Sequence, residues 1–285
     1  MEYYEPRNIP NRRLIGYETQ KKVLYAMGLK TAIEGGDKRA LLFGYPGVGK
    51  SIAPYDTACT LNNKYGCRFS LLHIRCEELI ELRDLKDLYR YVEESEQLIV
   101  VFDEMEALAP PIEEISAERA RVVHACRRFF DQQHEKTLMI AITNYLPRIE
   151  RSIFRKFSGY PIYFPPTSDE ILAELIKENL GVSIEIAEKT VRIMLRECSD
   201  MGLKPMGDHV VRACKSIRGR SYSKDNPEEL AKQLLGAMPA PPLEEDVARY
   251  KSRYRPLILY FERHTSSFWL EELKRLEERL QAAGA

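Results

Sequence analysis

The stretch Gly44-Tyr-Pro-Gly-Val-Gly-Lys-Ser51 decides the fold class of this 285-residue chain. It has the form G-x-x-x-x-G-K-[ST] and directly follows the apolar run Ala40–Phe43, which predicts a strand. Glycines at these positions let successive backbone N–H groups converge on phosphate oxygens. Lys50 would bring a mobile positive charge to the outer phosphates, and the Ser51 hydroxyl would ligate Mg²⁺. The stretch therefore predicts a site for a nucleotide and Mg²⁺.

The residues after this loop predict a helix that starts near Gly49 and points its positive end at the phosphates. Pro54 falls within the first turns of that helix, where proline removes a backbone hydrogen bond and crowds the preceding turn. Two interpretations stay open: a kink that the helix tolerates, or a distorted loop.

Short apolar runs alternate with helical stretches through the first part of the chain. The runs are Ala40–Phe43, Phe69–Ile74, Leu98–Phe102, Leu138–Thr143 and Ile162–Phe164. Alternation of this kind predicts a parallel sheet covered by helices on both faces. Because Leu98–Phe102 is apolar at every position, it is typical of a central strand.

After Pro165-Pro166 the pattern becomes helical only. Thr167 and Glu170 have the spacing of a capping box, and further helices are predicted from Ser183, from Gly207 and from Asn226. We expect an α/β fold of the P-loop class with a small all-helical lid and a C-terminal helical extension. The expected parts are a tail over residues 1–13, a nucleotide-binding core over 14–166, the lid over 167–237 and the extension over 238–285.

Composition sets broad limits. Lysine plus arginine equals aspartate plus glutamate at 43 each, so contact with nucleic acid or membrane would need a local patch. The six cysteines form no C-x-x-C pair, which is typical of inert thiols in a reducing compartment. No apolar run reaches the ~20 residues that span a bilayer, and the N-terminus has no signal-peptide core. We expect a soluble cytoplasmic protein.

The run Leu98–Phe102 ends in two carboxylates. Asp103 would hold the Mg²⁺ shell, and Glu104 would orient or deprotonate the attacking water. Taken alone, such a pair fits a solvated strand end equally well. Its position downstream of a phosphate loop favours the catalytic interpretation.

Asn144 follows the run Leu138–Thr143. If this strand neighbours the strand of Asp103, the amide would lie beside the outer phosphate and hold the lytic water. The alternative is a turn-forming asparagine before Tyr-Leu-Pro.

The order of GYPGVGKS, LIVVFDEMEALAP, IAITN and RIERSIFRKF resembles the AAA+ ATPases, and within them the AAA clade. These segments match that family's Walker A, Walker B, sensor 1 and arginine-finger regions, and the segment Leu14–Glu18 is similar to the one that lines its adenine pocket. The resemblance implies that ATP is the nucleotide. The implied nucleotide-contacting residues are Ile15, Gly16, Gly44, Tyr45, Pro46, Gly47, Val48, Gly49, Lys50, Ser51, Ile52 and Asp103.

Carried over by position, Arg155 matches an arginine finger, which reaches the outer phosphate of a neighbouring subunit. Lys156 falls where the clade often has a second arginine, and lysine lacks the planar fork. Pro205–Asp208 resembles the sensor 2 region, and Arg212 is either a charged sensor or a surface residue. The stretch Cys76–Arg83 has neither the aromatic residue nor the glycine of a peptide-threading pore loop.

The C-terminal segment carries two further patterns. Basic and aromatic residues interleave over Arg249–Arg263, which would suit single-stranded nucleic acid or a helix packed on the lid. The piece Phe268–Leu280 has an apolar stripe at helical spacing.

These features predict an ATP-binding protein that hydrolyses ATP with Mg²⁺. Glu104, Asn144 and Arg155 are the expected catalytic residues, and Ser51 and Asp103 the metal ligands. By resemblance it would work as a homo-oligomer, a hexameric ring that remodels an unknown protein substrate. The alternatives are a nucleic-acid-directed ATPase of the helicase-loader type and a weakly hydrolysing, nucleotide-gated scaffold.

Overall fold

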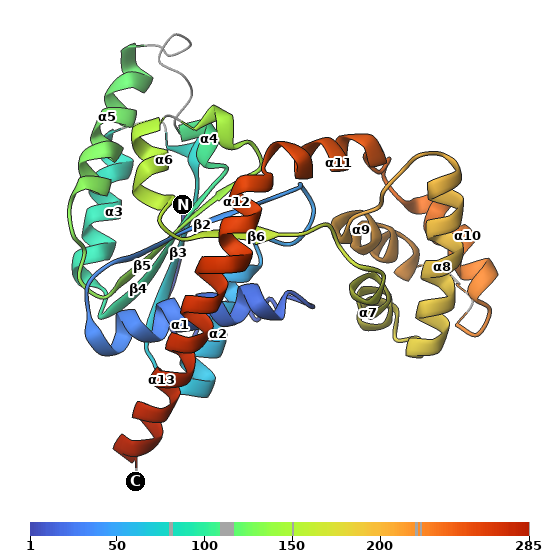
Figure 1. The fold of residues 1–285 in the computed structure, drawn as a ribbon, viewed down its shortest axis with the longest axis horizontal. Helices are drawn as coiled ribbons and strands as arrows, with labels where there is room; N and C mark the ends of the chain where they lie inside the picture. Colours follow the sequence, from blue (N-terminus) through green and yellow to red (C-terminus); the bar gives the residue numbers. More distant parts are fainter. Residues whose placement is uncertain (80–81, 109–116, 150, 220–221, 223, 285) are drawn as a thin grey trace. The chain divides into compact units, whose positions relative to one another are not determined.

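The computed structural model describes residues 1–79, 82–108, 117–149, 151–219, 222 and 224–284. The chain divides into two compact units (Figure 1), which are described separately. The first comprises Met1–Phe43, Lys50–Tyr163 and Pro256–Ala285, and the second comprises Gly44–Gly49 and Phe164–Arg255.

A six-stranded sheet in the order β1-β3-β4-β5-β2-β6 forms the centre of the first unit. The strands are β1 (Glu2–Tyr4), β2 (Lys38–Gly44), β3 (Phe69–Arg75), β4 (Gln97–Asp103), β5 (Thr137–Thr143) and β6 (Pro161–Phe164). The pairs β3–β4, β4–β5 and β5–β2 are parallel. The predicted α/β fold is confirmed, and each apolar run lies within an observed strand.

The N-terminal segment that we expected to be a tail contributes β1, which pairs antiparallel with β3. Its alternating tyrosines explain this placement. Tyr3 stacks on Tyr91, with ring centroids 4.4 Å apart, while Tyr4 meets Tyr55 edge-on at 5.9 Å. The edge of the sheet at β3 is therefore covered by the chain's own first residues.

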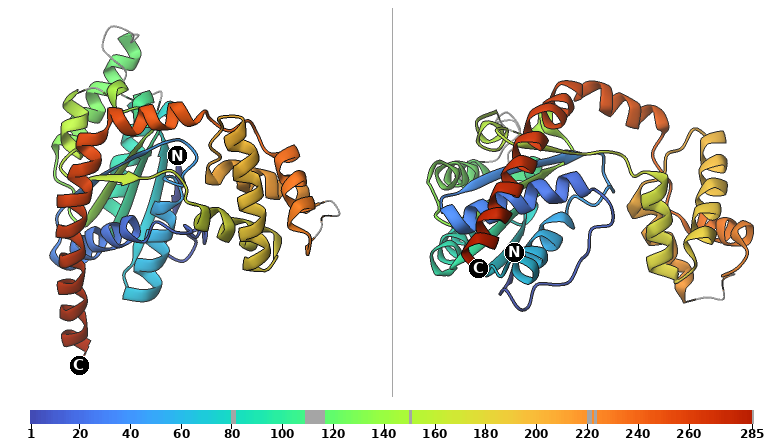
Figure 2. Two further views of the ribbon diagram at one scale, coloured as in Figure 1. Left: turned by 45° about the vertical axis from the view of Figure 1, so that its right-hand side comes forward. Right: turned by 60° about the horizontal axis from the view of Figure 1, so that its bottom comes forward.

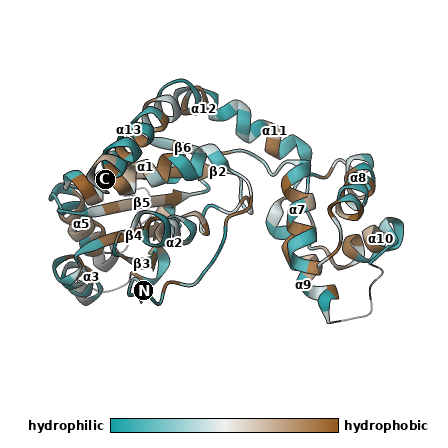
Figure 3. Ribbon diagram, turned by 90° about the horizontal axis from the view of Figure 1, so that it is seen from below, coloured by the Kyte–Doolittle hydropathy of each residue, from teal (hydrophilic) through white to brown (hydrophobic). Residues whose placement is uncertain are grey.

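Helices cover both faces of the sheet (Figure 1). They are α1 (Glu18–Glu34), α2 (Ala53–Tyr65), α3 (Leu82–Glu94), α4 (Met105–Leu108), α5 (Ala117–Asp131) and α6 (Arg151–Phe157). The central strands are coloured mainly as hydrophobic (Figure 3), and Leu98–Phe102 of β4 is buried throughout. Phe102 contacts Phe129 and Phe130 of α5 and Phe157 of α6 edge-on, so these two helices are fixed to the same strand.

The last part of the chain comprises α12 (Arg255–Tyr260), a π-helical turn (Phe261–Thr265) and α13 (Ser266–Gly284). The predicted helix over Phe268–Leu280 is confirmed. It packs along α1 (Figure 2), with Trp269 only 1% exposed. The stripe residues Leu273 and Leu276 are also buried.

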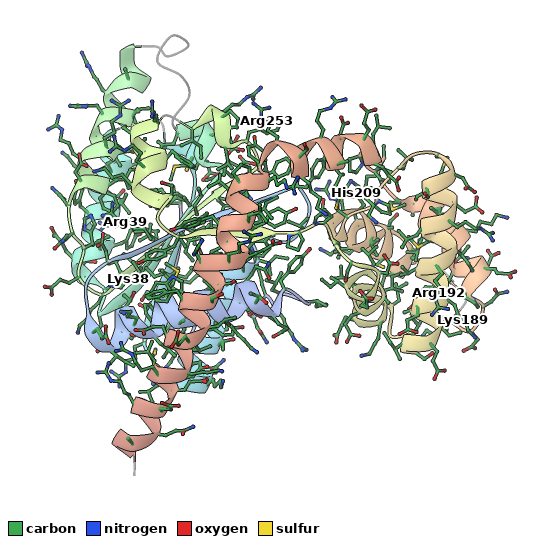
Figure 4. All side chains as sticks on the ribbon, in the orientation of Figure 1. Lys38, Arg39, Lys189, Arg192, His209 and Arg253 are labelled. Carbon is green, nitrogen blue, oxygen red and sulfur yellow. The ribbon has the colours of Figure 1, made fainter. Side chains whose placement is uncertain are left out.

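The second unit is helical: α7 (Asp169–Leu180), α8 (Ile184–Asp200), α9 (Gly207–Arg218), α10 (Pro227–Ala237) and α11 (Glu244–Arg253). α7 to α10 share one apolar core, and the charged side chains of α8, such as Lys189 and Arg192, are exposed on its outer side (Figure 4). Ser183 and Asn226 cap their helices as predicted. The predicted capping box at Thr167 is wrong, because Ser168 caps α7 and the Thr167 hydroxyl accepts a bond from Gly207 N at 3.0 Å instead.

Candidate nucleotide site

The glycine-rich loop after β2 has the backbone that its glycines permit. Gly47 and Gly49 have φ of 82° and 95°, in the region that favours glycine. Gly47 also touches the start of α9, where Asp208 N donates to Gly47 O at 3.0 Å. A Cβ at Gly47 would lie 3.3 Å from the Asp208 Cβ. The structure thus brings the expected sensor 2 segment, Pro205–Asp208, against the loop, whereas Arg212 pairs with Asp208 at 2.9 Å.

The predicted start of the following helix near Gly49 is wrong. α2 begins at Ala53 with proline in its first turn. Because Pro54 has no N–H, it cannot donate to the carbonyl of Lys50, and Ala53 N bonds that oxygen instead at 3.2 Å. Proline is well tolerated in a first turn, so the helix itself is not kinked. Lys50 and Ser51 lie in turns that precede the helix.

Lys50 is buried, with 4% of its surface exposed. Burial lowers the pKa of its ammonium group, and the charges of the Asp103 and Glu106 carboxylates raise it. Burial has the larger effect, so the pKa is about 7. An anion bound beside the ammonium would favour its charged form. The position therefore suits a phosphate group.

Ser51 and Asp103 lie near each other, and the Ser51 hydroxyl contributes to the lowered pKa of the Asp103 carboxyl group. Burial raises the pKa of Asp103, but hydrogen bonds from His73 and Ser51 outweigh it and hold the pKa below its ordinary value. The carboxylate therefore stays ionised. An ionised carboxylate next to a serine hydroxyl offers two oxygen ligands for a hard cation.

Glu104 lies at the strained end of β4. It has φ of 55°, which is uncommon for a residue other than glycine, and strain of this kind clusters at functional sites. Its side chain is exposed. Partial burial raises the pKa of its carboxyl group, and the nearby charges of Glu77 and Asp103 raise it further. A raised pKa suits a carboxylate that accepts a proton near neutral pH.

The strand of Asn144 does neighbour the strand of Asp103, because β5 pairs with β4. Asn144 N donates to Glu106 Oε1 of α4 at 3.1 Å, which ties the end of β5 to the turn after Glu104. Sequence reasoning assigned no role to Glu106, although it lies one turn beyond the acidic pair.

The segment expected at the adenine is fixed to α2. Leu14 N donates to Asp56 Oδ1 at 3.1 Å, and Tyr25 donates to Asp56 Oδ2 at 2.6 Å. Ile15 and Gly16 follow directly, and both are partly exposed. Their backbone is therefore held beside the helix that follows the phosphate loop.

Asp103, Glu104 and Glu106 lie near the end of β4 and are called the carboxylate cluster. Glu106 Oε2 is buried and has no hydrogen-bond partner among the described residues, so the cluster has unused acceptor capacity. Over the described part of the chain, no group of three or more His, Cys, Asp or Glu side chains could hold a metal by itself. Mg²⁺ commonly uses one or two protein ligands and completes its shell with water and substrate phosphates, and Ser51 and Asp103 could supply them.

Arg155 lies elsewhere in the first unit, on the exposed side of α6. It lines a cavity of about 540 Å³ between α5 and α6, which we call the basic cavity. The lining residues are His124, Arg127, Arg128, Phe130, Asp131, Ser152, Ile153, Arg155 and Lys156. Lys156 is paired with Asp131, so the charges of the arginines dominate the cavity. The sequence analysis assigned no role to Arg127 or Arg128, because two adjacent arginines on a helix are typical of a solvent-exposed face.

His73 was also missed. Both of its ring nitrogens are hydrogen-bonded: Nδ1 lies 2.7 Å from Tyr55 Oη, and Nε2 lies 3.1 Å from Asp103 Oδ2. A titratable ring inside the mostly apolar run Phe69–Ile74 was the available signal.

Comparison with known proteins identifies the central segment. Residues 40–164 match the model of the ATPase family associated with various cellular activities, AAA. No curated protein matches the chain. Among the described residues, no helix is both long enough and apolar enough to cross a membrane.

Solved structures share the fold. The FIGL-1 AAA domain in complex with ADP has a TM-score of 0.64 at 16% identity, covering 86% of this chain and 89% of that one. The FIGL-1 AAA domain has a TM-score of 0.63 at 17% identity, covering 85% and 87%. The HORMA:CdnC:Trip13 complex of E. coli MS115-1 has a TM-score of 0.63 at 15% identity, covering 84% and 96%. Residues 40–164, which include the phosphate loop and the strands around it, are therefore similar to the AAA ATPase family domain, and the chain shares the fold of the solved AAA domains.

Proposed function

We propose that this protein binds ATP at the loop Gly44–Ser51 and hydrolyses it to ADP and phosphate with Mg²⁺. The observation that carries the proposal is the convergence of buried Lys50, the hydrogen-bonded Asp103 carboxylate and the strained Glu104 at one end of β4. The resemblance of the fold to an AAA domain with ADP bound supports the nucleotide.

Each residue has a defined part in this proposal. The Lys50 ammonium pairs with the outer phosphates, and Ser51 and Asp103 hold the metal, which would neutralise phosphate charge when bound. Glu104 accepts the proton of the attacking water. Asn144, held through its backbone by Glu106, offers an amide that orients the water without competing for the metal.

We also propose that the protein works as a ring of identical subunits, a hexamer, which remodels a protein assembly. The basic cavity supports this, because Arg155 lies with Arg127 and Arg128 in a place suited to an anion. A Trip13 structure in complex with other proteins is among the structural matches, which favours a protein as the substrate.

The alternative, a nucleic-acid-directed ATPase, requires exposed rings on the segment Arg249–Arg263. Tyr254 and Phe261 are buried there. Tyr250 contacts Tyr45 of the phosphate loop, with centroids 5.7 Å apart. Of the four aromatic residues, Tyr250, Tyr254 and Phe261 thus pack within the protein, and Tyr260, at 47% exposed, is the one ring open to a base. ATPase activity that rises on addition of single-stranded oligonucleotides, with a steep salt dependence, would favour this alternative.

Glu104→Gln tests the proposed reaction. The amide keeps the shape of the side chain but cannot accept a proton, so hydrolysis should fall by about 10²–10⁴ while affinity for ATP stays unchanged. Phosphate release and binding of a fluorescent ATP analogue measure the two quantities. A variant that hydrolyses ATP at the parental rate would exclude Glu104 as the base, and a parent protein that binds tightly without turnover would favour the scaffold alternative.

A further inference from the structure

His73 joins three parts of the first unit around the Asp103 carboxylate. It lies on β3, its Nδ1 is 2.7 Å from the hydroxyl of Tyr55 on α2, and its Nε2 is 3.1 Å from Asp103 Oδ2 on β4. The side chains of His73 and Asp103 are 10% and 14% exposed. A nearly enclosed imidazole with a partner at each nitrogen has a fixed ring orientation.

The partners also fix the direction of the hydrogen bonds. Asp103 is ionised and can only accept, so the His73 Nε2–H donates to it. In the neutral ring Nδ1 then accepts from the Tyr55 hydroxyl. The imidazole is thus held by a phenol on one side and holds a carboxylate on the other.

The Asp103 carboxylate is constrained at both oxygens. Oδ2 accepts from His73 at 3.1 Å, and Oδ1 accepts from Glu104 N at 3.0 Å. These bonds leave the carboxylate little freedom to rotate. Its remaining lone pairs therefore point in fixed directions.

The ring of Tyr55 is also in contact with residues of the N-terminal segment. The guanidinium of Arg12 lies over its ring at 4.3 Å, and Tyr4 of β1 meets it edge-on. Tyr4 in turn donates to Glu2 Oε2 at 2.6 Å. The chain of contacts runs from the N-terminal residues to the end of β4, and Tyr55 is its middle member.

We propose that His73 is a positioning residue, which, held by the Tyr55 hydroxyl, orients the Asp103 carboxylate for Mg²⁺. This inference rests on the proposed function, since it assigns the second layer of the same metal site. Hydrogen-bond partners of metal-ligating carboxylates typically contribute 10–100-fold to metal affinity. Loss of the imidazole should therefore weaken Mg²⁺ binding and leave the contacts of the nucleotide itself in place.

The test measures the Mg²⁺ concentration that half-saturates the tightening of a fluorescent ADP analogue, which needs no hydrolysis. For His73→Leu this midpoint should rise about 10–100-fold, while the affinity for the analogue in EDTA stays at the parental value. Tyr55→Phe removes only the hydroxyl and should shift the midpoint in the same direction by less. His73→Gln keeps an N–H donor at the place of Nε2 and should restore most of the affinity.

Tyr65→Phe is the matched control. Tyr65 lies on the same helix and also donates to a carboxylate, Glu277, at 2.6 Å, but this one is remote from Asp103. Its midpoint should equal that of the parent. An unchanged midpoint in His73→Leu, or an equal loss of affinity in EDTA, would overturn the proposal.

If His73→Leu fails to fold, Tyr55→Phe and His73→Gln decide. A Tyr55→Phe protein with the parental melting temperature and the parental midpoint would contradict the assignment. A parent protein that binds the analogue with no response to Mg²⁺ would instead contradict the proposed function, so the two failures are distinguishable.

Discussion

Two clusters of the first unit have opposite charge and opposite construction. The carboxylate cluster lies at the end of β4, with Lys50 buried beside it. The basic cavity lies between α5 and α6, with Arg155 exposed within it. The carboxylate cluster holds the proposed base, Glu104, and a proposed metal ligand, Asp103, whereas the lining of the basic cavity includes three arginines.

In the proposed reaction the two clusters would supply different groups to phosphate transfer. A phosphoryl group in transfer spreads negative charge that a positive group must stabilise, and Lys50 is the cation placed to do so at the carboxylate cluster. The basic cavity would add the guanidinium groups of Arg127, Arg128 and Arg155 as further positive charge. We infer that the two clusters act together when they belong to different copies of the chain.

Arg155→Ala should have the largest effect of any single change. Its guanidinium would stabilise charge on the outer phosphate of an adjacent subunit, and such arginines contribute about 10³–10⁵ to the rate where they have been measured. ATPase activity should fall to this extent, while nucleotide affinity in the same subunit stays unchanged. Steady-state phosphate release and a binding titration separate the two.

A mixing experiment makes this prediction sharper. Mixtures of Arg155→Ala and Glu104→Gln subunits should regain activity, because some interfaces then pair an intact Glu104 with an intact Arg155. Arg151→Ala, an exposed arginine on the same helix, is the control and should change little. Activity that does not depend on protein concentration, with no rescue in mixtures that co-assemble, would contradict the comparison between the clusters.

A change in α13 tests how much the packing of this helix stabilises the first unit that holds both clusters. Trp269 packs edge-on against Tyr160, with centroids 5.1 Å apart, and is almost fully buried. Trp269→Ala should lower the free energy of unfolding by about 3–5 kcal/mol, as measured by denaturant titration. Phe268→Ala is the control, because Phe268 is 48% exposed, and it should cost far less. Equal losses would show that the burial of Trp269 is not what stabilises α13.

Lys50→Ala removes the buried cation beside the carboxylate cluster. The phosphates lose their principal positive partner, so affinity for a fluorescent ATP analogue should fall about tenfold or more, equivalent to at least about 1.4 kcal/mol. Lys38→Ala on the opposite end of β2 (Figure 4) is a matched control and should bind normally. Unchanged affinity in Lys50→Ala would mean that the loop is not the nucleotide site.

The strands and the phosphate loop could be predicted because their signals are local. The run Leu98–Phe102 is apolar at every residue, and burial on both faces follows from that pattern. The same holds for Ser183 and Asn226, whose side chains bond N–H groups within their own first turn. Thr167 has an equally good local pattern, yet its hydroxyl bonds Gly207, which is far away in sequence.

The remainder of the candidate site depends on contacts between distant segments. His73 meets Asp103 only because β3 and β4 are neighbours in the sheet, and Arg128 meets Arg155 only because α5 and α6 share the aromatic residues around Phe102. These contacts cannot be predicted from the spacing of residues in the sequence. The start of α2 was predicted wrongly for a different reason. The local signal was present in Pro54, because proline favours the first turn of a helix and so predicts a start at Ala53.

The smallest predicted effect concerns the charges that hold α13 on α1. Glu272 is buried and accepts from Lys30 Nζ at 2.6 Å and from Arg275 at 2.7 Å. Burial raises the pKa of its carboxyl group, but the bonds from Lys30 and Arg275 outweigh it and hold the pKa below the ordinary value of 4.5. A carboxyl group with a lowered pKa stabilises the fold above its unfolded pKa, and this stabilisation is lost as pH falls through the folded value. Glu272→Gln should therefore lower the free energy of unfolding by about 1 kcal/mol at pH 7. The difference in this free energy between the variant and the parent should shrink as the pH falls below 4.5. Glu271→Gln, exposed on the same turn, should cost nothing measurable at either pH. Denaturant titrations at both pH values check this, and a difference that persists unchanged in acid would mean that the shape of Glu272, and not its charge, holds the two helices together.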